Sequence, residues 1–94
     1  MTEEVLFNAS AERYEIRVGD ELAGFTEAHP RPDGTVMFPH TQIAPAFEGK
    51  GLASKLVQGA FDDIRERGLR ATVTCPYILG WLQKHPEYQG LVSD

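Results

Sequence analysis

The period of the hydrophobic positions changes about halfway along the chain. Residues 5–8 and 14–18 are short runs of β type, and a turn at residues 18–21 leads to a further run over 22–28. These runs predict a β-meander. Residues 30–34, Pro-Arg-Pro-Asp-Gly, carry the strongest turn signal, because Pro fixes φ and Asp-Gly tolerates a positive φ. A further strand is therefore expected from Thr35.

The strand expected from Thr35 contains prolines that interrupt it. Simple alternation would place Phe38 and His40 on the same face. Pro39 and Pro45, however, lie on either side of His40, and a proline within a strand removes a donor from the hydrogen-bond ladder. We therefore expect this strand to bulge or to splay from a neighbour near its end, which would leave a gap for a ligand.

From Ala53 onwards the apolar residues recur at helical spacing, which predicts a helix over about 53–67 that is buried along one side. Gly68 is placed to end this helix as a left-handed cap. The apolar stripe consists of Leu56, Val57, Ala60, Phe61 and Ile64.

The remaining elements complete an alternating order. Residues 70–74 predict a buried strand, and Cys75 follows it. Pro is favoured at the first position of a helix, so Pro76 is expected to begin a short helix that continues to Lys84. A meander, a strand, a helix, a strand and a helix indicate an α/β or α+β fold, and we expect residues 1–94 to form one domain.

The loop before the long helix is rich in glycine. Glu48, Gly49, Lys50 and Gly51 lead from the interrupted strand directly into the helix. Glycines allow a sharp turn with outward-facing amides, and the helix N-terminus adds free N–H groups and the positive end of its dipole. The loop therefore predicts a binding site for a phosphate or pyrophosphate.

Composition narrows the possible partners. The chain has 94 residues, a net charge of −5 and no basic run, which argues against nucleic-acid binding, because such binding depends on clustered Lys and Arg. No apolar stretch approaches the length of a membrane span or a signal-peptide core. Cys75 is the only cysteine, so it cannot form an internal disulfide, which fits a reducing compartment. We expect a cytoplasmic protein.

Other site chemistries find little support. The spacing of a P-loop is absent, because Lys50 lies between the glycines rather than after them. Ser54 stands where a dinucleotide fingerprint would require its third glycine. A zinc site would have to collect Cys75 and scattered histidines without a short-spaced pair, so we expect no metal.

Several short motifs occur in an order that is typical of one family. They are His40-Thr41, Pro45, Gly49-Lys50-Gly51, Leu56-Val57, Cys75-Pro76-Tyr77 and the run from Lys84 to Tyr88. In this order the chain resembles the GNAT superfamily of acetyl-CoA-dependent N-acyltransferases, most closely its short YjdJ-like branch. The resemblance implies a minimal GNAT-like fold, with a mixed, mainly antiparallel sheet flanked by a cofactor-binding helix and a short C-terminal helix. It also implies transfer of an acetyl group to an amine acceptor, either a small molecule or a protein.

The resemblance assigns a binding site for coenzyme A. The amides of the glycine loop would receive the pyrophosphate, and the pantetheine arm would lie between the strand at His40 and the strand over 70–74. The implied cofactor-binding residues are Ile43, Ala44, Gly49, Lys50, Gly51, Leu52, Ala53, Ser54, Cys75 and Pro76.

Two residues depart from the pattern of the family. Glu48 stands where an Arg or Gln is usual, so its side chain is expected to point away or to be offset by Lys50 and Lys55. Trp81 stands near the position of a tyrosine that protonates the departing thiolate, and an indole N–H cannot act as that acid. The remaining candidates for this proton transfer are therefore Cys75, His40 and the tyrosines of the chain.

Cys75 and His40 are the catalytic candidates, and each has a plainer interpretation. At a helix N-terminus the dipole favours the thiolate of Cys75, which would make it an acyl acceptor, but a free cysteine at a strand end often only packs. His40 could transfer protons near neutral pH, although a structural role with Thr41 as its hydrogen-bond partner is favoured. Tyr77, Trp81 and Tyr88 could line a pocket, but aromatic residues four apart on a helix usually belong to the core, so Tyr77 and Trp81 are expected to pack together.

Two other functions remain open. The chain could be a non-catalytic module that binds acyl-CoA or another protein, or it could use Cys75 as a thioesterase does. The chain ends soon after its last helix, so we expect an open acceptor side, which would also allow a weak homodimer.

Overall fold

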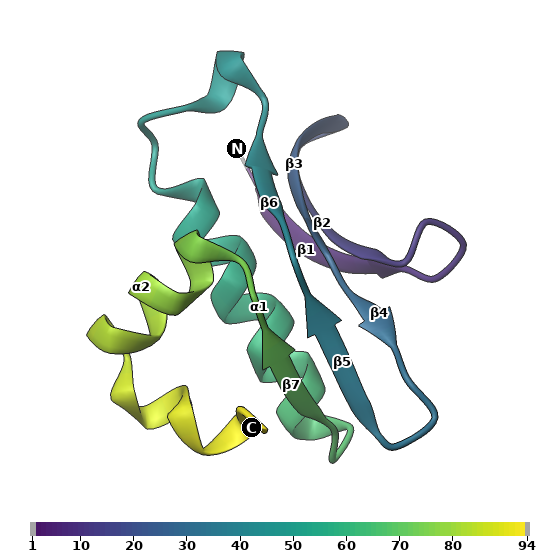
Figure 1. Cartoon of the computed structure of the whole chain (residues 1–94). Coiled ribbons are helices and arrows are strands. Elements are labelled where there is room, and N and C mark those ends of the chain that lie inside the picture. Colours follow the sequence, from purple (N-terminus) through teal and green to yellow (C-terminus); the bar gives the residue numbers. More distant parts are fainter. Residues whose placement is uncertain (1, 94) are drawn as a thin grey trace.

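A computed structural model describes residues 2–93 (Figure 1). The meander, the interrupted strand, the long helix, a further strand and a short helix follow one another as predicted. The elements are β1 (Glu3–Asn8), β2 (Arg13–Val18), β3 (Glu21–Glu27), β4 (His29–Pro30), β5 (Thr35–Phe38), β6 (Thr41–Ile43), the 3-10 helix η1 (Pro45–Phe47), α1 (Leu52–Glu66), β7 (Arg70–Val73), α2 (Pro76–Lys84) and the 3-10 helix η2 (Pro86–Leu91).

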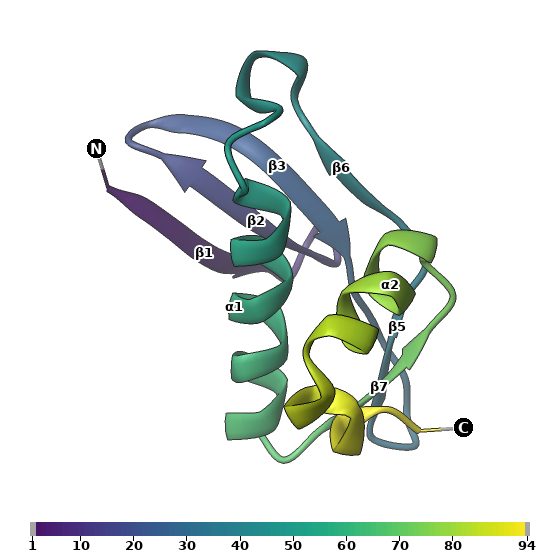
Figure 2. The same cartoon turned by 90° about the vertical axis from the view of Figure 1, so that its left-hand side faces the viewer.

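The strands form two hydrogen-bonded groups. Strands β1, β2, β3 and β6 are antiparallel neighbours in that order, whereas β5 pairs with β4 on one side and with β7, in parallel, on the other. The sheet is thus mixed and mainly antiparallel, as predicted. Both helices lie on the same side of it (Figure 2).

The chain passes from one group of strands to the other at Pro39. The Phe38 carbonyl accepts from the amides of Thr74 and Cys75, whereas the His40 carbonyl accepts from the amide of Glu27. The predicted splay is therefore confirmed. The expectation that Phe38 and His40 share a face is wrong, because Pro39 separates two strands: Phe38 is fully buried and His40 is exposed.

Helix α1 covers the meander with its apolar stripe. All the residues predicted for this stripe are buried, together with Leu52 at the first helical position. Gly68 has φ +72°, and its amide and that of Leu69 bond to the carbonyls of Arg65 and Ile64, so the predicted cap is confirmed. Within residues 2–93, no helix combines the length and apolar character needed to span a bilayer.

Helix α2 begins at Pro76 with Cys75 as its N-cap residue, as predicted. Strand β7 is less buried than expected, because β5 covers one of its edges and the other carries only a bridge from Ala71 to Val92. The expected contact between Tyr77 and Trp81 is wrong. Trp81 packs in the core, whereas Tyr77 is 42% exposed, because the buried stripe of α2 consists of Ile78, Trp81 and Leu82.

Candidate functional site

The loop between η1 and α1 presents a run of unused backbone donors. Gly49 and Gly51 adopt φ values of +79° and +74°, a left-handed conformation that turns the chain into the helix. Among the residues described, no acceptor is recorded for the amides of residues 49–54, and Gly51 caps α1 without a side-chain hydrogen bond. These N–H groups lie at the positive end of the helix dipole, an arrangement that suits an anion.

A cavity of about 320 Å³ opens beside this loop. Thr41 of β6 forms one wall, and Tyr77 of α2 lies on another side. The cavity thus occupies the gap that the splay at Pro39 leaves between β6 and α2. The predicted cofactor residues among its lining are Ile43, Gly49, Gly51, Leu52, Ala53 and Ser54.

The other predicted cofactor residues lie outside this lining. Lys50 borders a separate hollow next to Glu3, and Pro76 borders one that the cavity adjoins at Ser54 and Tyr77. Ala44 borders a hollow on the outer face of β6. Its amide donates to the carbonyl of Ala23 at 2.7 Å, so it is already engaged in the sheet. Cys75 lies behind Thr41 and is 3% exposed.

We expected Lys50 or Lys55 to offset the charge of Glu48, but within residues 2–93 neither lysine forms an ion pair with it. Glu48 lines the cavity at its exposed edge. Lys55 forms an ion pair with Glu3 instead, and Lys50 borders a different hollow. The carboxylate therefore stays in contact with solvent, which weakens its field at the loop.

Trp81 and Ser54 connect the two helices at the site. The indole Nε1–H of Trp81 donates to Ser54 Oγ at 2.9 Å, so the Ser54 hydroxyl keeps its own proton free to donate. This bond fixes the first turn of α1 against α2. The sequence marked Trp81 only as a departure from a tyrosine, and its contact with α1 depends on packing that no local pattern reports.

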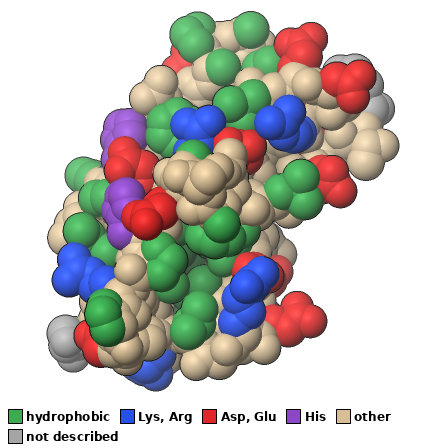
Figure 3. All heavy atoms as spheres, turned by 90° about the vertical axis from the view of Figure 1, so that its right-hand side faces the viewer, with side chains coloured by type: hydrophobic (Ala, Val, Ile, Leu, Met, Phe, Trp, Pro, Cys, Tyr) green, Lys and Arg blue, Asp and Glu red, His purple; other side chains and the backbone are tan. Residues whose placement is uncertain are grey.

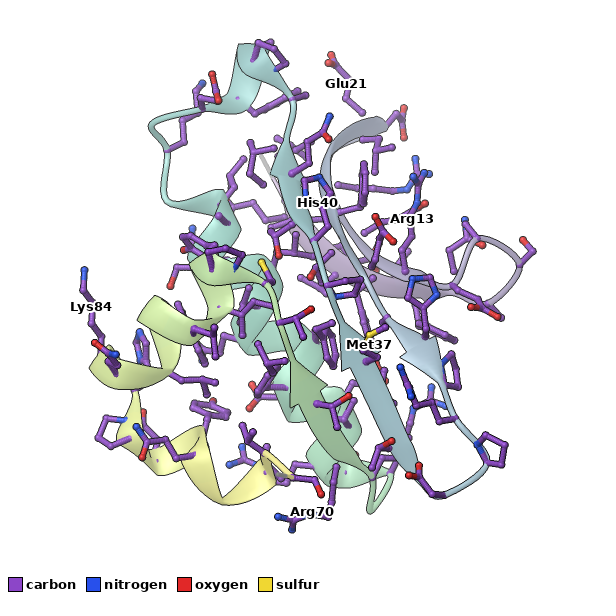
Figure 4. The ribbon with its side chains drawn as sticks, in the orientation of Figure 1. Arg13, Glu21, Met37, His40, Arg70 and Lys84 are labelled. Carbon is purple, nitrogen blue, oxygen red and sulfur yellow. The ribbon has the colours of Figure 1, made fainter. Side chains whose placement is uncertain are left out.

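Cys75 and His40 are not brought together. The Cys75 S–H donates to Thr41 Oγ1 at 3.4 Å, on the cavity side of β6. His40 lies on the side of β6 toward β3 and Arg13 (Figure 4), with Nε2 3.2 Å from Gln42 Oε1. The expected partnership of His40 with Thr41 is therefore wrong, because neighbouring residues of a strand point to opposite faces.

Tyr77 is a residue of the site that sequence reasoning placed in the core. It lines the cavity, and burial raises the pKa of its phenol, with a smaller contribution from the neighbouring charge of a Cys75 thiolate. The phenol thus stays protonated at neutral pH. Tyr88 lies elsewhere: its hydroxyl donates to Asp62 Oδ1 at 2.7 Å on the outer part of α1.

The sequence model of one family, described as GCN5-related N-acetyl-transferase, matches residues 13–91. The chain belongs to this GNAT family. Protein NATD1 of Xenopus tropicalis is 38% identical over 52 residues, which are 55% of this chain and 48% of that protein. The match thus spans about half the length of this curated relative.

Solved structures share the GNAT fold of the chain. A GCN5-like protein of Staphylococcus aureus, described as a candidate N-acetyltransferase, has a TM-score of 0.71 over 96% of this chain and 87% of its own, at 18% identity. The ribosomal-protein-alanine N-acetyltransferase of Brucella melitensis has a TM-score of 0.56 over 87% of this chain and 61% of its own, at 20% identity. These likenesses confirm the predicted fold class.

Proposed function

We propose that this GNAT domain binds acetyl-CoA and transfers its acetyl group to an amine. The observation that carries the proposal is the run of amides at residues 49–54, which have no hydrogen-bond acceptor within residues 2–93 and border a cavity. A coenzyme A pyrophosphate would satisfy these donors and complement the helix dipole. The family supports acyl transfer from acetyl-CoA in general.

Each part of the cavity suits a different part of such a ligand. The glycine loop and the first turn of α1 offer N–H groups to the pyrophosphate, and the free proton of the Ser54 hydroxyl adds a donor. The wall formed by Thr41 and Ile43 would border the pantetheine arm and lead toward Cys75. When bound, acetyl-CoA supplies an activated thioester carbonyl. Its acceptor would be an amine nucleophile.

Of the two predicted catalytic residues, Cys75 is the better placed. Its thiol contacts Thr41, which lines the cavity, and a thiol can accept an acyl group before an amine removes it. His40 packs against Phe25 on the outer face, at 6.2 Å between ring centroids. We therefore assign acyl capture to Cys75 and give His40 a role through its backbone carbonyl, which bonds to Glu27 and Thr26.

Titration with coenzyme A, followed by amide chemical shifts, tests the binding site. Shifts are expected at residues 49–54 and along β6. Shifts confined to the outer face, around Phe25 and Gln42, would contradict the assignment.

Mass spectrometry after incubation with acetyl-CoA and a primary amine tests the chemistry. A transient adduct of acetyl mass on Cys75, followed by an acetylated amine, is the expected result. Cys75→Ser is expected to abolish the adduct.

A non-catalytic acyl-CoA-binding module is the second candidate. The burial of Cys75 favours it, since the thiol is 3% exposed. Coenzyme A shifts at residues 49–54, combined with the absence of transfer to every amine tested, would support this module instead of the enzyme.

A further inference from the structure

Cys75 is the first member of a chain of hydroxyl groups. Its S–H donates to Thr41 Oγ1 at 3.4 Å, and Thr41 Oγ1 lies 2.9 Å from Thr26 Oγ1. Thr26 in turn donates to the backbone carbonyl of His40 at 3.4 Å. Each hydroxyl has one proton, so Thr26 uses its own on His40 and Thr41 uses its own on Thr26. The oxygen of Thr41 is then left to accept from Cys75.

The threonines differ in what they face. Thr26 and Thr41 are direct neighbours in the register of β3 and β6. Thr26 is fully buried, and Cys75 is nearly so. Thr41 alone among these residues lines the cavity, so it contacts the thiol on one side and borders the space for the acyl donor on the other.

A thiol that attacks a thioester must lose its proton, and the sulfur that departs must gain one. The indole of Trp81 does not meet this need, because its N–H is engaged with Ser54. The Thr41 hydroxyl can meet both needs, since it accepts at its oxygen and donates its own hydrogen.

We infer that Thr41 transfers the proton between Cys75 and the departing thiolate. As Cys75 Sγ forms its bond to the acyl carbon, the bond from that carbon to the other sulfur breaks. The Cys75 proton passes to Thr41 Oγ1, and the hydroxyl proton of Thr41 passes to the departing sulfur. Thr41 ends with one proton, as it began. This step rests on the proposed acyl transfer through Cys75.

Thr26 is a positioning residue in this arrangement. Its proton is committed to the His40 carbonyl, so its oxygen holds the Thr41 hydroxyl until the acyl donor enters.

The S–H stretching band tests the hydrogen bond without any substrate. Cys75 is the only thiol in the chain, so the band has a single source. Thr41→Val, which keeps the shape and removes the hydroxyl, is expected to move this band toward the frequency of a free thiol. Thr41→Ser is expected to leave it in place. An unchanged band in Thr41→Val would overturn the inference.

The rate of Cys75 acetylation tests the proton transfer. We expect Thr41→Val to slow adduct formation by about 100-fold, the usual loss when a general acid–base group is removed. Thr41→Ser should keep most of the rate, and coenzyme A shifts should persist in both variants. Thr72→Val is the matched control, because the Thr72 hydroxyl is buried with no recorded partner, so its loss should not change the rate. Equal rates in wild type and Thr41→Val would contradict the role of Thr41.

A separate variant examines the competing proton donor. Tyr77 also lines the cavity, and Tyr77→Phe removes its phenolic proton. If Tyr77→Phe slows adduct formation and Thr41→Val does not, the assignment to Thr41 is overturned. If Thr41→Val does not fold, the rate of Cys75 acetylation in the wild type is measured in mixtures of H₂O and D₂O. A relay that moves more than one proton should give a curved dependence of this rate on the fraction of D₂O. A linear dependence would contradict the relay.

These outcomes separate the inference from the function on which it rests. Acetylation of an amine without a Cys75 adduct would end the inference and leave the acetyltransferase proposal intact. Absence of coenzyme A shifts at residues 49–54 would end the proposed function itself.

Discussion

At the scale of single residues, the loop glycines set the backbone geometry of the proposed anion site. Gly49 and Gly51 have positive φ, and a Cβ atom built on either would meet no atom within 4 Å. Glycine is therefore needed at these two positions for its backbone conformation and not for lack of space. At positive φ, the Cβ atom of any other L-residue crowds its own backbone.

We expect Gly51→Ala to lower the free energy of unfolding by about 1 kcal/mol, because the left-handed conformation disfavours a Cβ atom. It should also weaken coenzyme A binding, as relaxation of the strain would misalign the amides. Urea unfolding measures the change in stability, and titration with coenzyme A, followed by amide chemical shifts, measures the change in affinity. Gly80→Ala is the control: it lies in α2 with open space around it, so it should gain up to about 1 kcal/mol. Unchanged stability in Gly51→Ala would contradict the assigned strain.

His29 makes stability depend on pH. Its ring nitrogens lie 2.8 Å from Glu12 Oε1 and 3.0 Å from Glu27 Oε1, and these hydrogen bonds raise the pKa of His29. Only the imidazolium can donate at both positions. Because the folded pKa is raised, this stabilisation is fully present below the unfolded value of about 6.5 and is lost as pH rises through the folded value.

The stability difference between wild type and His29→Ala is therefore expected to be larger at acidic pH than at alkaline pH. Urea unfolding across this range measures it. Glu12→Gln should reduce the pH dependence, because it replaces the carboxylate whose hydrogen bond raises the pKa of His29 most with a neutral amide. A difference that stays constant with pH would show that the ring acts only through packing.

At the scale of elements, the site depends on how α1 and α2 meet. The hydrogen bond from Trp81 to Ser54 joins the first turn of α1 to α2, and Trp81 also packs on Phe61 at 5.9 Å between ring centroids. The first turn of α1, which we propose to bind the anion, is thereby fixed relative to the wall that α2 contributes.

Trp81→Phe keeps an aromatic ring but loses this hydrogen bond. We expect a loss of about 1 kcal/mol in stability together with weaker coenzyme A binding, measured by urea unfolding and shift titration. Tyr88→Phe is the matched control, because its hydroxyl bonds to Asp62 away from the cavity. It should cost similar stability and leave coenzyme A affinity unchanged. Equal affinities in the two variants would contradict a role for Trp81 in the site.

How far the sequence predicted the structure depends on the range of the interactions involved. Gly68, Pro76 and the splay at Pro39 were predictable because glycine and proline act on their own backbone. The contact between Thr41 and Thr26 was not, because Thr26 lies 15 residues away on another strand. The exposure of Tyr77 was also missed, since helical spacing does not indicate which turn faces a cavity.

At the scale of the whole molecule, the sheet separates the side that carries the cavity and both helices from an outer side. Histidine side chains on the outer side lie beside acidic ones (Figure 3). His40 belongs to this side through its contact with Phe25. Its imidazole is thus separated from the cavity by the strand itself.

His40→Ala is accordingly expected to retain acetyl transfer, because the substitution preserves the carbonyl that Thr26 contacts. Steady-state kinetics across neutral pH measure it, with Cys75→Ser as the inactive comparison. A large loss of rate in His40→Ala, together with the loss of the pH dependence of the rate near neutral pH, would show that the imidazole takes part in proton transfer.

The donors of the proposed anion site are peptide groups, so exchanging side chains in the loop leaves most of them in place. Alanine scanning would therefore underestimate the loop, and the surrounding side chains could change widely while the ligand was still held. Proline at position 53 or an amide-to-ester replacement removes a single N–H and would measure its contribution directly.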